Sequence, residues 1–425
     1  MVVLNVPVER HRLSNGLRVN LSPDSSTPIV GVNLWYAVGS RNEGPGLTGL
    51  AHLFEHMMFQ GSVNVPKNRH FELIESAGGS LNASTWFDRT NYYDTVPSHQ
   101  LELALWLESD RMGWMIPAMT DEKLHNQQEV VKNERKERYD NQPYGDWDER
   151  ILALVFPPSH PYHHPVIGSM EDIGGATLED MAEFSRTFYV PNNAVLTLAG
   201  DFEPGRALGL VDRYFGEIPA GPPVPPVPGI VDIPPVMGTT VREEVVDDVP
   251  LPRVYLAARV PSFPSDGFQT ARVAATVLGS GKASRLYRSL VRDKALAKDV
   301  LTYVFPLEVS ASLLLLWVTG YPGEDPGRLE RALLEEVEGL ASVSQEELDR
   351  AVAMTETHLL REIQQVGERA DLLSMFDQIF DDPARLNSEV ERVRSVNRIR
   401  VEGFASEFLG PDNRALLTYV PGGAS

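Results

Sequence analysis

Apolar positions follow two different periodicities along this chain of 425 residues. Short runs of apolar, β-branched and aromatic residues predict strands, whereas apolar residues recurring every three or four positions predict amphipathic helices. Strands are expected at 29–38, 194–199 and 313–318, and helices at 47–58, 101–115, 120–139, 270–278 and 329–340. Because the two kinds mix without a regular strand–helix–strand order, we expect the α+β class rather than a doubly wound parallel sheet.

A proline-rich stretch interrupts these elements near the middle of the chain. Eight prolines fall between Pro219 and Pro235, where they disfavour helices and interior strands and stiffen the backbone. We therefore predict an N-terminal domain at 1–218, a linker at 219–238 and a C-terminal domain at 239–425.

The two halves share a short repeat. Segment 188–197 reads FYVPNNAVLT and segment 408–417 reads FLGPDNRALL, so Phe, Pro, Asn and Leu coincide at an offset of 220 residues. Chance similarity is one explanation for a single short match. Self-similarity over half the chain, with a linker between the halves, favours a duplicated domain.

The charge balance is strongly acidic and changes the choice of partners. The chain has 38 Lys and Arg against 59 Asp and Glu, a net charge of −21. Such a surface repels phosphate backbones, which argues against a nucleic-acid binder, and it attracts cationic substrates. A purely solvating acidic surface explains the same numbers equally well.

Other compositional features exclude whole classes of chemistry. The chain has no cysteine, so disulfides, thiol catalysis and cysteine metal sites are ruled out. No apolar run is long enough for a membrane span, and the segment 1–7 lacks the pattern of a signal peptide. We expect the bacterial cytoplasm as the compartment, or the periplasm if a signal peptide has been removed.

The sharpest chemical feature is the motif His52-Leu53-Phe54-Glu55-His56. On a helix, positions i and i+4 lie one turn apart on one face, so both imidazoles can bind one zinc ion. Glu55 lies beside the same face and can take a proton from a water held there. This is the inverted form of the His-Glu-x-x-His arrangement of zinc peptidases.

A catalytic zinc site takes three protein ligands and keeps one position open for water. The helix expected at 120–139 offers Glu129 and Glu134 as the third ligand. Spacing alone does not decide between these two carboxylates.

The chain resembles the pitrilysin-type (M16) metallopeptidases, and among them the bacterial M16B-like relatives of the mitochondrial processing peptidase β subunit. The resemblance rests on HLFEH at 52–56, VVKNE at 130–134, GGSLNAST at 78–85 and PYHHPVIG at 161–168. It covers the whole chain. It implies two homologous domains of the LuxS/metallohydrolase-like kind, each a mostly antiparallel sheet packed with helices, and only the first with a zinc site.

The resemblance also implies roles for individual residues. His52, His56 and Glu134 match the ligands of one zinc ion per chain, and Glu55 matches the general base. Glu134 is favoured over Glu129 because it occupies the last position of the Val-Val-x-x-Glu pattern. Many relatives carry a supporting carboxylate seven residues before the third ligand. This chain has Gln127 there, which puts that support in doubt.

A substrate-binding strand is implied at 80–85. In this family a peptide adds as a β-strand to an exposed sheet edge, and backbone hydrogen bonds give affinity regardless of sequence. Asn82, Ala83 and Ser84 are the positions expected to make this contact, although an ordinary hairpin strand would have the same sequence pattern.

The second half departs from the family. Active members carry an Arg and a Tyr seven residues apart that bind substrate and stabilise the oxyanion. Arg292 matches the Arg, but Asp299, or Lys298 with a one-residue gap, stands where the Tyr belongs.

We therefore expect a zinc-dependent endopeptidase that acts on extended peptides, with basic ones favoured by the acidic surface, as the catalytic subunit of a heterodimer. A homologous M16 partner would supply the Arg/Tyr pair. The alternatives are a self-sufficient homodimer and a non-catalytic scaffold or peptide-binding subunit.

Overall fold

Two mixed sheets carry the strands of the computed structural model, which describes residues 4–422. The first has the order β1 (Glu9–Arg12), β2 (Arg18–Pro23), β6 (Ala194–Gly200), β3 (Ile29–Tyr36), β5 (Thr90–Pro97) and β4 (Ser80–Thr85). The second has the order β7 (Thr239–Asp247), β11 (Asn413–Pro421), β8 (Arg253–Pro261), β10 (Ala311–Gly320) and β9 (Ala297–Phe305). Residues 1–3, the first part of the segment 1–7 that lacks a signal-peptide pattern, lie outside the described range.

The two sheets repeat one topology. Strand β6 pairs in parallel with β2 and antiparallel with β3, and β11 pairs in the same way with β7 and β8. The next two strands follow in the same order in both sheets, β3–β5–β4 and β8–β10–β9. All pairings other than β2–β6 and β7–β11 are antiparallel. The expected α+β fold with two mostly antiparallel, homologous domains is confirmed.

The repeated Asn shows why the two repeats fold alike. The side-chain amide of Asn193 donates to the carbonyls of Phe188 (2.8 Å) and Ala37 (3.4 Å) at the start of β6. Asn413, 220 residues later, donates to Phe408 (2.7 Å) and Arg259 (2.7 Å) at the start of β11. The same side chain therefore joins the same helix end to the same neighbouring strand in both halves.

The described chain divides into two compact units that are not continuous in sequence. The first holds the chain up to Arg135 together with His164–Pro228 and Leu360–Ser388. The second holds Lys136–His163, Gly229–Leu359 and the chain from Glu389 onward. These units group residues by contact. The predicted boundaries at 218 and 239 follow the sequence repeat instead, and they stay a prediction.

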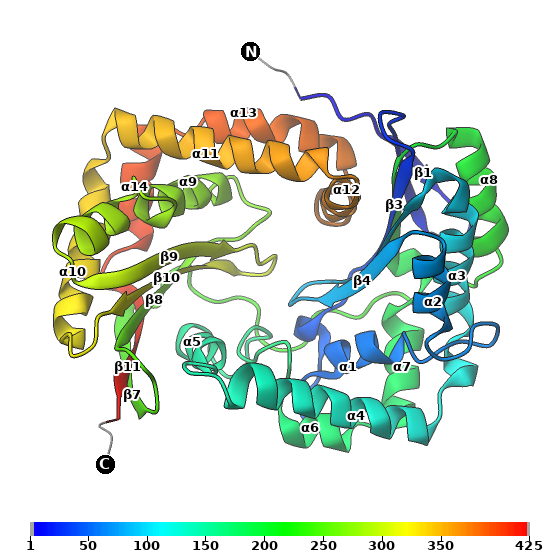
Figure 1. Cartoon of the computed structure of the whole chain (residues 1–425), viewed down its shortest axis with the longest axis horizontal. Coiled ribbons are helices and arrows are strands. Elements are labelled where there is room, and N and C mark those ends of the chain that lie inside the picture. Colours follow the sequence, from blue (N-terminus) through cyan, green and yellow to red (C-terminus); the bar gives the residue numbers. More distant parts are fainter. Residues whose placement is uncertain (1–3, 423–425) are drawn as a thin grey trace. The chain divides into compact units, whose positions relative to one another are not determined.

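In the first unit, helices cover both faces of the sheet (Figure 1). Its helices are α1 (Leu50–Met57), α2 (Arg69–Ser76), α3 (Leu101–Trp114), α4 (Asp121–Arg135), α6 (Met170–Gly175), α7 (Leu178–Phe188), α8 (Pro204–Phe215) and α12 (Val366–Phe380). Helix α3 packs on β3 and β5, whereas α12, from the second half of the sequence, packs on β3 and β6. Because both faces are covered, β6 is buried along its whole length.

In the second unit, α5 (Trp147–Val155) from the first half of the sequence packs on β8 and β11. The Trp147 and Tyr255 rings stack with their centroids 5.5 Å apart and 4° between their planes. The other helices that lie largely in this unit are α9 (Phe268–Gly279), α10 (Pro326–Glu338), α11 (Gln345–Gln364), α13 (Glu389–Arg394) and α14 (Arg398–Phe408). Each half of the sequence thus contributes one helix, α5 or α12, to the sheet formed by the other half.

The expected elements all form where the periodicity placed them, with shifts of a few residues at their ends. The helix expected at 120–139 ends as an α-helix at Arg135 and continues as a π-helical turn, Lys136–Asp140; a second such turn is Tyr287–Asp293. Short 3₁₀ turns lie at Ser40–Asn42, Ser98–Gln100, Ile116–Ala118, Pro191–Asn193, Gly339–Ser342 and Pro383–Ser388.

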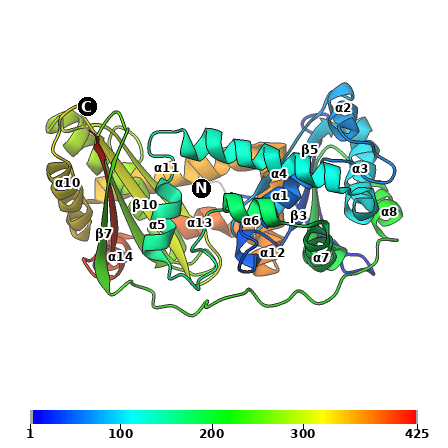
Figure 2. The ribbon, with the colours of Figure 1, turned by 90° about the horizontal axis from the view of Figure 1, so that it is seen from below.

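The proline-rich segment 219–238 carries neither helix nor strand, as its composition predicts (Figure 2). Among the described residues, no helix combines the length and the apolar character that crossing a membrane requires.

Candidate metal centre and active site

Helix α1, which carries the His-x-x-Glu-His motif, begins at a constrained glycine. Gly49 has a φ of +88°, and a Cβ there would lie 2.6 Å from the carbonyl oxygen of Ile167. The Glu43 carboxylate accepts hydrogen bonds from the backbone N–H of Gly49 (2.9 Å) and of Ala51 (2.8 Å). A carboxyl group in this place satisfies amides that the first helical turn leaves free, while burial raises the pKa of Glu43 well above its ordinary value. Glu43 therefore fixes where the motif helix starts.

The two faces of α1 differ sharply. One face is buried in the first unit through Leu50, Leu53, Phe54 and Met57. The Phe54 ring lies against the Tyr189 ring, with 4.1 Å between centroids. This packing leaves His52 and His56 on the other face, partly exposed, with ring centroids 4.8 Å apart.

Glu134, near the end of α4, reaches this pair of imidazoles. Its Oε2 lies 3.4 Å from His56 Nε2 and 3.9 Å from His52 Nε2. Ligand atoms of the three residues all lie within 4.8 Å of one another. Two ligands about 2.1 Å from a tetrahedral zinc ion are about 3.4 Å apart, so two imidazoles and one carboxylate at these distances fit zinc. The side chains are 15%, 23% and 17% exposed for His52, His56 and Glu134, which leaves access for water.

Glu55 lies beside these three residues and is held by strand β4. The Thr85 hydroxyl, at the end of β4, donates to Glu55 Oε2 at 2.6 Å. Burial raises the pKa of Glu55 above its ordinary value, while the Thr85 hydrogen bond and the nearby His56 and Arg89 act in the opposite direction. A fixed carboxylate of this kind can act as a general base. Thr85 belongs to the GGSLNAST motif, but its contact with Glu55 was not expected from the sequence.

The other candidate on α4 lies in a different environment. Glu129 forms an ion pair with Lys132 (3.1 Å), and its side chain is 53% exposed. Gln127 is buried, and its amide donates to Asn126 Oδ1 at 2.9 Å. The structure thus brings Glu134, and not Glu129, into the cluster with the two histidines.

Among the described residues, strand β4 ends the order of the first sheet and pairs with β5 alone. Asn82 is exposed, and its side-chain oxygen accepts from the backbone N–H of Ala83 at 2.9 Å. The Ser84 side chain is engaged within the protein, because it donates to Asn91 Oδ1 at 2.7 Å. A strand at the end of a sheet can in general take up an added peptide strand, and the contact expected at Asn82, Ala83 and Ser84 stays a prediction.

The residues that stand at the family's Arg and Tyr positions in the second half of the sequence lie in the second unit. Arg292 is at the exposed end of the turn Tyr287–Asp293 and forms an ion pair with Asp293 (2.6 Å). Asp299, on β9, accepts from the Thr319 hydroxyl (2.9 Å) and from the Trp317 indole (3.3 Å). Asp299 is thus tied into its sheet, and Lys298 beside it is exposed.

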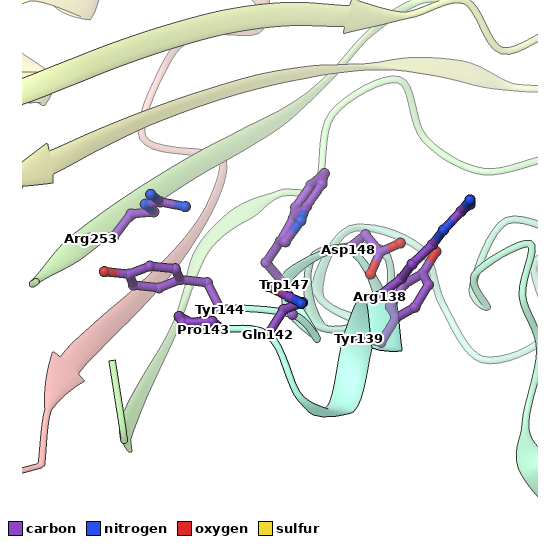
Figure 3. Close-up of a pocket in the computed structure, with 9 residues that line it drawn as sticks. Arg138, Tyr139, Gln142, Pro143, Tyr144, Trp147, Asp148 and Arg253 are labelled. Atoms are coloured by element: carbon purple, nitrogen blue, oxygen red, sulfur yellow. The ribbon is translucent and has the colours of Figure 1, made fainter. Parts of the chain in front are cut away.

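The second unit also contains a cavity of about 320 Å³. Its lining includes Tyr144, Trp147, Asp148 and Arg253 (Figure 3). The Arg253 guanidinium lies 3.9 Å from the centre of the Tyr144 ring. Tyr144 has a φ of +63°, and its hydroxyl donates to the carbonyl of Leu251 at 2.7 Å. The lining thus combines aromatic faces with charges of both signs.

A second cluster of titratable residues is buried between α2, α3 and β5. Glu108 forms an ion pair with Arg111, whose guanidinium lies 4.1 Å from the centre of the Tyr92 ring. Burial lowers the pKa of His70 well below its ordinary value, and burial beside Glu108 raises the pKa of Asp94 well above its own. Burial thus favours the neutral forms of His70 and Asp94, while Glu108 and Arg111 pair with each other.

The raised pKa of Asp94 predicts an effect of pH on stability. Folded Asp94 keeps its proton at pH values where the unfolded chain has lost it, so stability falls as pH rises from the ordinary carboxyl pKa of about 3.9 toward the raised one. Asp94→Asn does not titrate. We expect its Tm advantage over the wild type to grow as pH rises above about 4, as measured by calorimetry.

Asp266→Asn is the matched control, because the Asp266 side chain is 94% exposed. Its Tm should follow the wild-type curve at every pH. If the Tm curves of Asp94→Asn and the wild type run parallel, Asp94 is not held protonated in the fold.

The fold and site together define a two-unit α+β protein with an inverted His-x-x-Glu-His centre at one sheet edge. The profile described as Insulinase (Peptidase family M16) matches residues 18–150, and the profile described as Peptidase M16 inactive domain matches residues 175–355. This chain belongs to the M16 peptidase family, as the resemblance predicted.

Individual relatives agree with this assignment. The zinc protease PqqE of Helicobacter pylori is 29% identical over 373 residues, which are 87% of this chain and 80% of that protein. A solved structure of a protease from the same organism has a TM-score of 0.90 at 27% identity, covering 98% of this chain and all of the other. The probable mitochondrial-processing peptidase subunit beta of Arabidopsis thaliana is 26% identical over 65% of this chain and 52% of its own length.

Proposed function

We propose that this chain is a zinc-dependent endopeptidase that cleaves peptides or unfolded segments bound as an added strand along β4. One observation carries the proposal: Glu55, flanked by the His52, His56 and Glu134 cluster, is hydrogen-bonded to Thr85 of the edge strand itself. The proposed metal ligands, the proposed base and the proposed peptide-binding edge thus all belong to the first unit.

The residues divide the chemistry between them. His52, His56 and Glu134 would hold one zinc ion. Zinc, when bound, supplies the charge that polarises the scissile carbonyl and acidifies a water molecule. Glu55 takes the proton from the attacking water and delivers it to the amine nitrogen as the peptide C–N bond breaks. Thr85 holds the Glu55 carboxylate in place for both transfers.

Substrate recognition would come mainly from the backbone. A peptide added to the free edge of β4 forms main-chain hydrogen bonds, which select for extended segments rather than for a particular sequence. The net charge of −21 favours basic segments, because opposite charges steer association.

We further propose that the chain is the catalytic subunit of a heterodimer. Neither Asp299 nor Lys298 can provide the phenol that active relatives place seven residues after the Arg, and Arg292 is paired with Asp293. A carboxylate at that place would oppose a developing oxyanion. The relative from Arabidopsis thaliana is named as a subunit, which supports catalysis by an assembly of more than one chain. A homologous M16 partner would supply the Arg/Tyr pair.

Peptide cleavage and zinc content, measured on the same sample, test this proposal. We expect about one zinc per chain with little hydrolysis of a basic, unstructured peptide by the chain alone, and hydrolysis once a homologous subunit with the Arg/Tyr pair is added. Rapid cleavage by the chain alone would replace the heterodimer with a self-sufficient homodimer. Zinc-loaded chain that binds peptide but never cleaves it, with any partner, would indicate a peptide-binding subunit.

A further inference from the structure

A line of polar side chains connects α12 to the edge strand on the face of the first sheet opposite α1. The Asn91 amide donates to Asp371 Oδ1 at 2.6 Å, and Asn33 donates to the same oxygen at 3.2 Å. Ser84 donates to Asn91 Oδ1 at 2.7 Å and accepts from Arg89 at 2.6 Å. Asn33 and Asn91 are buried, so these bonds are shielded from water.

Asp371 sets which groups donate and which accept along this line of hydrogen bonds. A carboxylate oxygen accepts from the amide nitrogen of Asn91, which turns the amide oxygen of Asn91 toward Ser84. The Ser84 hydroxyl is then the donor to this oxygen. The Asp371 carboxylate is thus the acceptor on α12 that holds the Asn91 amide in this orientation, and its removal should weaken the contact between Asn91 and Ser84.

Neighbouring residues of β4 are thereby held from both faces of the sheet. Successive side chains of a strand point to opposite faces. Ser84 is tied toward α12, and Thr85, the next residue, is tied to Glu55 on α1. The end of β4 therefore connects α12, a helix from the second half of the sequence, to Glu55, the proposed base.

Strand β4 benefits from such support, because within the described part of the chain it has a sheet neighbour on one side only. A peptide that adds to an already ordered strand does not bear the entropy cost of ordering it. We propose that Asp371 is a positioning residue that keeps β4 ordered and thereby sets the affinity for extended peptides. This inference rests on the proposed function, because it concerns the same edge.

Peptide binding to zinc-loaded chain in the inactive Glu55→Gln background measures this effect. The probe is a fluorescent, basic, unstructured peptide followed by anisotropy. Asp371→Ala should weaken binding about tenfold, as expected if the ordered strand falls to about a tenth of the population. Asp371→Asn, which still offers an oxygen acceptor to Asn91, should restore most of the affinity. Ser84→Ala removes the hydrogen bond from β4 to Asn91 and should weaken binding as much as Asp371→Ala does. It replaces Asp371→Ala in the test if that variant does not fold.

Asp377→Ala is the matched control on the same helix. Asp377 is fully buried and forms ion pairs with Arg10 (2.7 Å) and Arg18 (3.4 Å), away from β4. We expect this variant to lower Tm and leave peptide affinity unchanged. Equal weakening by Asp371→Ala and Asp377→Ala would overturn the inference, because general loosening of α12 would then explain both.

Hydrogen exchange of segment 80–85, without peptide, gives an independent result. Exchange should accelerate in Asp371→Ala and Ser84→Ala but not in Asp377→Ala. Unchanged exchange in the first two variants would overturn the inference. If the Glu55→Gln parent binds no peptide, the proposed function fails, and exchange alone decides whether Asp371 orders β4.

Discussion

Glu55→Gln is expected to lower the rate of peptide hydrolysis by about 10²- to 10⁴-fold, the usual contribution of a general base. Glutamine has the same size and still accepts the hydrogen bond from Thr85, but it cannot take a proton from water. Glu55 is not one of the three clustered ligands, so zinc content should stay at about one per chain. The measurement pairs steady-state hydrolysis with metal analysis, under conditions in which the wild type cleaves.

Glu75→Gln is the control for the loss of one negative charge. Glu75 lies on α2 of the same unit and is exposed, so this variant should keep wild-type rates and zinc content. Near wild-type cleavage by Glu55→Gln would show that another group takes the proton. Loss of zinc from Glu55→Gln would instead place Glu55 among the ligands.

The sequence predicted the parts of the site that lie close together along the chain. The spacing of His52, Glu55 and His56 is a property of one helix, so periodicity alone places them on one face. The proposed third ligand is different, since Glu129 and Glu134 lie on the same distant helix and the local pattern cannot choose between them. Only the resemblance to the M16 family favoured Glu134, and the structure brings it to the histidines.

The contacts that were missed join residues far apart in sequence. Thr85 reaches Glu55 across 30 residues, and Asp371 reaches Asn91 across 280. Nothing in the local sequence around Asp371 indicates a partner on β5. The repeat predicted two alike halves, which the shared strand order confirms, but it carried no information that α5 and α12 pack on the sheet of the other half.

Glu134→Gln is expected to lower zinc affinity by more than about 100-fold, because removing even a residue that only supports a ligand costs about 10- to 100-fold. The carboxylate supplies the negative charge that two neutral imidazoles lack, and an amide oxygen does not replace it. Zinc content after dialysis, and competition with a chromophoric chelator, measure the change. Hydrolysis should fall with zinc occupancy and return when zinc is added in excess.

Glu129→Gln provides the decisive comparison on the same helix. Its carboxylate is paired with Lys132 and more than half exposed, so we expect wild-type zinc affinity and a stability change of at most about 0.5 kcal/mol. Both variants should keep the wild-type circular dichroism spectrum, because Glu129 and Glu134 are not core residues. If Glu129→Gln empties the site while Glu134→Gln keeps zinc, the two carboxylates exchange roles. If neither variant loses zinc, the metal is not held by α4, and the arrangement of His52, His56 and Glu134 does not describe the site of the bound ion.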